Sequence, residues 1–209
     1  MRTANDVLDF WFGQGPFDAG RLAERSAFWF STGDRETVAH NDALIRETLE
    51  PMLAAAARGE FASWASSPKR RLALIILYDQ VPRSAYRGTA AAYAFDREAL
   101  ALTAEGMQLA ADAALEPLER VFFYLPLEHA ESLEAQDAAV AAMDRLVREA
   151  PPELRDYCEY CAKFAHSHRE IIAKFGRFPH RNAVLKREST PEEAAWLAAG
   201  GESFGQTSR

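Results

Sequence analysis

A chain of 209 residues, 48% hydrophobic and 26% charged, is long enough to bury one sizeable core, and we expect a single domain over residues 1–200. Its 24 basic and 31 acidic residues give a net charge of −7, so it lacks the basic field with which proteins bind nucleic acids or membrane surfaces. The longest apolar run, residues 72–78, is far shorter than the roughly 20 residues that cross a bilayer. The N-terminal MRTANDVLDFWFG carries acids where a signal peptide would be apolar, so we expect a cytoplasmic protein.

The first part of the chain predicts three helices, over residues 5–12, 18–30 and 34–49. The first is expected to be capped by Asn5 or Asp6 and the third by Asp34, because short polar side chains accept hydrogen bonds from the free backbone N–H groups. Pro51 is expected to end the third helix and start a new one.

The stretch that follows Pro68 predicts the central helix of the fold. Residues 72–78 are apolar in every direction at 3.6 residues per turn, and such a helix must be covered on all sides. We therefore expect Ile75 and Ile76 to be almost wholly buried. At one end of this helix the sequence places a carboxylate, an amide and two cations. We therefore take that end as the candidate site, formed by Asp79, Gln80, Arg83 and Arg87.

Further helices are predicted over residues 97–115, capped by Asp96, and over 118–129, 133–147, 154–175 and 191–199. Alternating strand patterns are absent, so the chain predicts an all-α array of eight to ten helices, with residues 201–209 as a loosely held tail. Paired helical hairpins of the tetratricopeptide kind are a further expectation, although no 34-residue signature recurs. Cys158 and Cys161 form a C-x-x-C inside a helical pattern, with no second pair, and we interpret them as packed or half-exposed thiols.

Polar residues interrupt the apolar stripes of several predicted helices. His129 follows Leu125 on one stripe, Gln136 lies where a core residue is expected, and His168 breaks the apolar face of the last long helix. A buried polar group without a partner costs about 1 to 3 kcal/mol, so such exceptions on separate helices are best explained if they meet one another or a ligand.

The turn RFPHRN adds further charge beside these positions, and arginine forks bind carboxylate or phosphate with two hydrogen bonds. We therefore predict a pocket for a small anionic molecule. If chemistry occurs there, His129 or His168 would act as acid or base with Asp79 or Glu131 orienting it. The predicted ligand-binding residues are Asp79, Gln80, Arg83, Arg87, His129, Glu131, Gln136, His168, Arg177, His180, Arg181 and Asn182.

Two other interpretations remain open. The same polar residues could pair with one another and lock the helices of an interaction scaffold, with a protein partner or a second copy of the chain as binding partner. Alternatively, His129, His168 and His180 with Asp79 or Glu131 could hold a metal ion for hydrolysis. No pair of them has the spacing of a metal motif, so no metal ligands are predicted, and the sequence leaves any cofactor unknown.

Three segments carry a resemblance to a known family: LYDQVPRSAYRG (77–88), ERVFFYLPLEHAES (119–132) and HREIIAKFGRFPHRN (168–182). They resemble hallmark segments of the bacterial family called domain of unknown function 924, and the resemblance spans nearly the whole chain. It implies a tetratricopeptide-like helical array, and it brings no established reaction or cofactor. One departure is visible at Lys186, where the family usually has the glycine of a short L-G-R.

Overall fold

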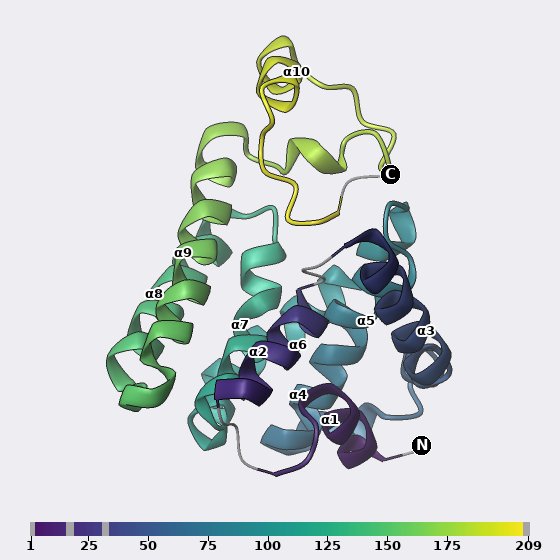
Figure 1. Ribbon diagram of the computed structural model, residues 1–209, viewed down its shortest axis with the longest axis vertical. Coiled ribbons are helices and arrows are strands. Elements are labelled where there is room, and N and C mark those ends of the chain that lie inside the picture. Colours follow the sequence, from purple (N-terminus) through teal and green to yellow (C-terminus); the bar gives the residue numbers. More distant parts are fainter. Residues whose placement is uncertain (1–2, 16–18, 31–33, 207–209) are drawn as a thin grey trace.

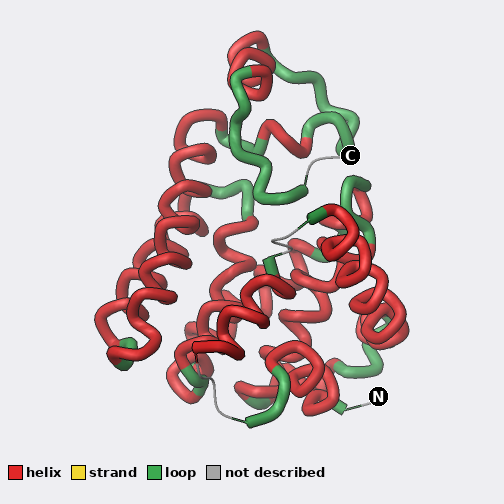
Figure 2. The backbone as a smooth tube through the Cα atoms, in the orientation of Figure 1, coloured by secondary structure: helices red, strands yellow, loops and turns green. Residues whose placement is uncertain are grey.

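The prediction of an all-α protein is confirmed. The computed structural model of the chain describes residues 3–15, 19–30 and 34–206, and these contain helices, turns and loops but no strand (Figures 1 and 2). The α-helices are α1 (Ala4–Phe12), α2 (Ala19–Trp29), α3 (Arg35–Ala57), α4 (Pro68–Ile75), α5 (Val81–Ala85), α6 (Asp96–Gln108), α7 (Pro117–His129), α8 (Leu133–Glu149), α9 (Pro152–Phe175) and α10 (Pro191–Ala198). Short 3-10 turns lie at Ala62–Ser66, Ala90–Tyr93, Ala111–Ala114 and Pro179–Arg181.

Residues 72–77 of the central helix are buried on all sides, as the sequence predicts, and Tyr78 is partly buried. The central helix consists of α4, a π-helical turn (η2, Ile76–Gln80) and α5, and both Ile75 and Ile76 have an exposed fraction of 0%. In the π-turn the backbone N–H of Val81 donates to the carbonyl of Ile76, five residues earlier. The next residue, Pro82, has no N–H to donate, so a regular helical ladder would lack a bond here in any case. Such π-turns are frequent at functional sites of helical proteins.

The other helices surround this centre. α8 and α9 pack side by side along one flank, and α3 lies at the opposite flank against α5 (Figure 1). α7 contacts both the α8–α9 pair and α4, so it connects that flank to the central helix. Its Phe122 packs edge-on against Trp11, Phe12 and Trp29, which fixes α1 and α2 on the core.

Three predicted helix boundaries are wrong. Thr3, and not Asn5 or Asp6, caps α1, since its hydroxyl accepts from the N–H of Asp6. α3 does begin after an Asp34 cap, but it continues through Pro51 to Ala57. Both Pro51 and Glu47 are exposed, so the carbonyl that Pro51 leaves without a helical partner can bind water.

The third wrong boundary concerns α6. Phe95 precedes this helix as its N-cap, and Asp96 is its first residue, whose carboxylate pairs with Arg83 and Arg181 instead of capping the backbone. α6 ends at Gln108, and a separate 3-10 turn follows at Ala111–Ala114.

The C-terminal region folds back over the end of α7. α9 ends at Phe175, and its C-cap Gly176 has a φ of 70°, the left-handed conformation that glycine adopts readily. α10 begins after a Thr190 cap. The segment predicted to be a loose tail is described as far as Gln206, while residues 207–209 lie outside the described residues. Within it Phe204 stacks on His168, with ring centroids 3.6 Å apart. Within the described ranges, no helix is long and apolar enough to cross a membrane.

Candidate functional site

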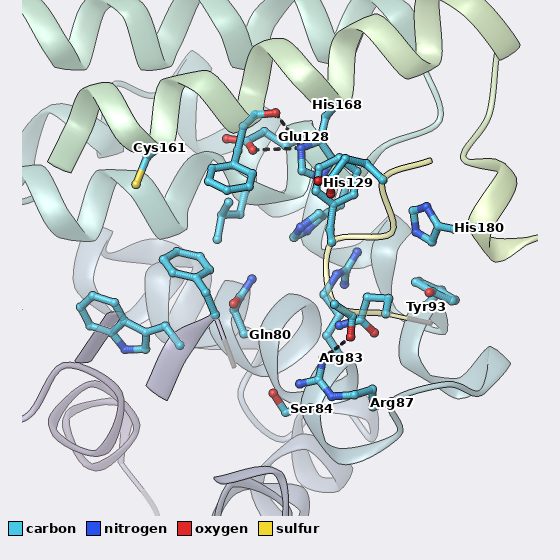
Figure 3. A pocket seen from close by; sticks show the side chains of 18 of the residues that line it. Gln80, Arg83, Ser84, Arg87, Tyr93, Glu128, His129, Cys161, His168 and His180 are labelled. Atoms are coloured by element: carbon cyan, nitrogen blue, oxygen red, sulfur yellow. Dashed lines mark hydrogen bonds and ion pairs between the residues drawn. The ribbon is translucent and has the colours of Figure 1, made fainter. Parts of the chain in front are cut away.

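A cavity of about 380 Å³ lies between the end of α2, the central helix, α7, α9 and the C-terminal segment (Figure 3). Its wall is apolar around Phe30, Val121, Leu125 and Phe164, and polar where the central helix, α7 and the residues after α9 meet. The predicted site residues that line the cavity are Gln80, Arg83, Arg87, His129, His168, His180 and Arg181.

Asp79 lies behind this wall and contacts three of its residues. Its Oδ1 is 2.7 Å from Nδ1 of His129 and 3.1 Å from Nη1 of Arg83, and Gln80 donates to Oδ2. Burial alone would raise the pKa of Asp79. The charge of Arg83, the charge that His129 carries when it is protonated at low pH, and these hydrogen bonds outweigh burial and lower the pKa to about 2. Asp79 is therefore ionised at neutral pH.

The same contact sets the protonation of His129. Burial, together with the charge of Arg83, lowers its pKa despite the favourable contact with Asp79, so the imidazole is neutral at neutral pH. An ionised carboxylate can only accept, so Nδ1 of His129 carries the proton and Nε2 is left as an acceptor. This pairing is the arrangement in which a histidine serves as a general base.

Arg181 lies in the cavity wall between two aromatic rings. Its guanidinium is 4.6 Å from the ring centre of Tyr93 and 4.4 Å from that of Phe178. The side chain is 6% exposed, and burial and the charge of Arg83 lower its pKa to about 10. Nη1 of Arg181 lies 3.3 Å from Oδ2 of Asp96. Arg83 binds the same carboxylate at 2.9 Å, so the two arginines share one aspartate.

Several hydrogen-bond donors at this end of the cavity are unused. Nε of Arg181, Nη2 of Arg83 and Oη of Tyr93 are buried, and none has a hydrogen-bond partner among the described residues. Arg87 also lines the cavity, but Asp42 accepts two hydrogen bonds from it and the carbonyl of Gly205 a third. Arg181, Arg83 and Tyr93 are therefore the groups that can receive an acidic ligand.

Glu128 and His168 face the same cavity from α7 and α9. Glu128 is 1% exposed, and burial and the charge of Asp79 raise its pKa well above its usual range. His168 donates from Nδ1 to the carbonyl of Phe164 at 2.8 Å, and burial, followed by the charge of His129, lowers its pKa well below its usual range. Both shifts favour the neutral form of the side chain.

The other predicted ligand residues do not line the cavity, and each has partners within the protein. Gln136 donates to two carbonyls at the end of α7, which fixes the turn into α8. Arg177 binds Glu193 with two hydrogen bonds, and Asn182 donates to the same carboxylate. Glu131 pairs with Arg187 at 2.6 Å and accepts from the N–H of Phe178. The Glu131 contacts fasten the C-terminal region to the turn between α7 and α8, and the Arg177 and Asn182 contacts hold that region together. The prediction that the four residues bind a ligand gains no support from the cavity.

A metal site gains no support either. Among the described residues, no group of three His, Cys, Asp or Glu side chains could hold a metal ion. His129, His168 and His180 share the cavity, but Asp79 and Phe164 already engage the Nδ1 atoms of the first two. Cys158 and Cys161 are both free and buried, which is the packed one of the two expected states, and burial raises the pKa of Cys161.

Sequence reasoning missed several cavity residues. Glu128 lies seven residues after Val121 and three after Leu125, so the same stripe that pointed to His129 could also have pointed to it. Tyr93 and Phe204 carry no such signal, because they lie in short turns whose position depends on the packing of distant helices.

Fold and site together define a helical protein with a cavity, partly apolar and partly polar, between its central helix and a C-terminal helical region. The chain belongs to the family described as "Bacterial protein of unknown function (DUF924)", whose sequence model matches residues 7–201. A solved structure of a protein of unknown function from Agrobacterium tumefaciens is similar, with 36% sequence identity, a TM-score of 0.76, and coverage of 94% of this chain and 97% of that chain. No match was found among curated proteins.

Proposed function

We propose that this protein binds a small organic anion in the cavity, with the acidic group of the ligand at Arg181. The observation that carries the proposal is the buried guanidinium of Arg181, which lies between the rings of Tyr93 and Phe178. Its Nε has no hydrogen-bond partner among the described residues, and it shares its ion-pair partner Asp96 with Arg83. Buried charges need partners, and a carboxylate or phosphate oxygen could accept from Arg181, Arg83 and Tyr93 together. The apolar wall at Val121 and Leu125 would receive the rest of the molecule.

Thermal-shift measurements at low salt with small carboxylates, inorganic phosphate and phosphate esters test this proposal. A ligand at 100 times its Kd should stabilise the protein by about 2.7 kcal/mol, and Arg181→Gln should remove the effect. Arg97→Gln is the matched control, since this side chain is 93% exposed and loses the same charge outside the cavity. If no acid binds to the parent protein, or if Arg181→Gln binds equally well, the proposal is wrong.

The scaffold interpretation is the second candidate for part of the predicted set. The ion pairs Glu131–Arg187 and Arg177–Glu193 support a fastening role for these residues, since each is bonded within the protein. A tetratricopeptide-like pairing of the helices, a cytoplasmic location, and a protein partner or homodimer stay predictions from the sequence.

A further inference from the structure

Glu128 has no part in binding an acid, yet it lines the same cavity. It is 1% exposed, and neither Oε1 nor Oε2 has a hydrogen-bond partner among the residues that the structure describes. Nδ1 of His168 lies 3.7 Å from Oε2, beyond hydrogen-bonding distance, and its proton is donated to the carbonyl of Phe164. A buried carboxyl group with two unused oxygens is destabilising unless something else supplies the donors.

The cavity that Glu128 lines also has aromatic residues, which suit a positively charged donor. Trp29, Phe30, Tyr160 and Phe164 contribute aromatic rings to its wall, and ring faces attract cations. No described lysine or arginine pairs with Glu128, so the protein itself does not supply that cation. The arginines of the cavity wall bind Asp79, Asp96 and Asp42 instead.

We propose that the ligand is bipolar: it carries a basic nitrogen that donates to the carboxyl oxygens of Glu128, and an acidic group that binds at Arg181. The chemical class is therefore an amino acid or another small amine that bears a carboxylate or phosphate. This inference rests on the proposed function for the acidic end and adds the recognition of the other end. Glu128 and Arg181 are contributed by different parts of the chain, so a ligand that reaches both is selected by length as well as by charge.

Binding of such a ligand should release a proton. The titratable groups that face Glu128 are Asp79, His168 and Cys161, together with its neighbour His129. The pKa shifts of these four groups favour an ionised Asp79 and the neutral forms of the other three, and burial, with the charge of Asp79, favours the protonated form of Glu128 in the empty cavity. When an ammonium group binds, Glu128 loses its proton to the solvent and the ammonium keeps its own.

The test compares ω-amino carboxylates, from 3-aminopropanoate to 8-aminooctanoate, with the unsubstituted carboxylates of equal chain length. Calorimetry in two buffers of different ionisation enthalpy measures both affinity and proton release in the parent protein. At the length that spans the cavity, the amine should bind at least about tenfold more tightly than its partner acid, with about one proton released.

Glu128→Gln should bring the two members of each pair to similar affinity and abolish proton release, while binding of the unsubstituted acids persists. Glu134→Gln, on the exposed face of α8, is the matched control and should behave as the parent. If unsubstituted acids bind as tightly as the amines at every length, the bipolar ligand is wrong but the anion site stands. If neither series nor any other acid binds, both proposals fail together.

Discussion

His129 Nδ1 lies 2.7 Å from Oδ1 of Asp79, so a carboxylate in the π-turn of the central helix holds the histidine that ends α7. The same carboxylate contacts Arg83 at 3.1 Å, and its exposed fraction is 0%. No solvent can replace a lost partner at this depth. Asp79 therefore connects two helices and also fixes the orientation of two residues of the cavity wall.

Replacing Asp79 by Asn should destabilise the protein by about 3 to 5 kcal/mol, because it leaves a buried arginine with reduced charge compensation. Urea unfolding at neutral pH measures this change. The control is Asp137→Asn, whose carboxylate is 54% exposed and pairs with Arg169, where a loss below about 1 kcal/mol is expected. Equal losses in the two variants would contradict the role given to Asp79.

Much of the fold could be predicted because the apolar pattern is strong. Residues 72–78 offer no polar side to water, so burial of Ile75 and Ile76 followed from the sequence alone. The π-turn could not be predicted, because it depends on the local fit between the end of α4 and Pro82. The end of α3 was mispredicted at Pro51, because a proline on an exposed helix face can be tolerated inside the helix.

The site could be predicted only in part. Asp79, His129 and His168 interrupt apolar stripes, which identified them as interior polar residues that meet. Whether such a residue faces a cavity or another protein group depends on atoms from distant segments. The sequence shows only that Glu131 and Arg181 are both charged residues. In the structure Arg187 neutralises Glu131, whereas the ion-pair partner of Arg181 is an aspartate that it shares with Arg83.

Lys186 offers a test of the departure from the family pattern. Its φ is 55°, the left-handed conformation that glycine adopts without strain, and the following Arg187 still reaches Glu131. Lys186→Gly should therefore stabilise the protein by about 1 kcal/mol in urea unfolding. Lys163→Gly, on the exposed face of α9, should destabilise the protein by about 1 kcal/mol, because glycine is unfavourable inside a helix. A destabilised Lys186→Gly variant would show that the lysine side chain makes a compensating contact.

His180 should make stability depend on pH. Burial, followed by the charge of Arg181, lowers its pKa to about 3, whereas an unfolded histidine titrates near 6.5. Between these values the unfolded chain binds more protons at this residue than the folded one, so stability present above about pH 6.5 is lost as the pH falls towards 3.

In His180→Asn this contribution disappears. The slope of the unfolding free energy against pH between about 3 and 6.5 should then fall by the amount that corresponds to a difference of about one bound proton between the unfolded and folded states. His40→Asn, at an exposed position of α3, is the control and should follow the parent profile. Urea titrations at several pH values measure the slopes. Parallel profiles for the parent and His180→Asn would mean that His180 is solvated in solution.

His168→Leu separates a ligand-binding role of this residue from a structural one. Nδ1 of His168 donates to the carbonyl of Phe164, which in α9 also accepts the backbone N–H of His168, so the substitution orphans no acceptor. Oε2 of Glu128 at 3.7 Å loses no hydrogen bond, and leucine can still pack against the ring of Phe204. The melting temperature should therefore hold or rise.

The same variant should lose the thermal-shift response to the acids that stabilise the parent, because the imidazole forms part of the cavity wall beside Glu128 and His129. His166→Leu, two residues earlier and half exposed, should keep both stability and response, since its contact with Asp144 lies at the surface. A His168→Leu protein that is clearly less stable, from a parent that responds to no acid, would favour the scaffold interpretation. In that case the histidine satisfies buried groups whose loss costs about 1 to 3 kcal/mol, and the polar residues around the cavity serve to hold the helices together.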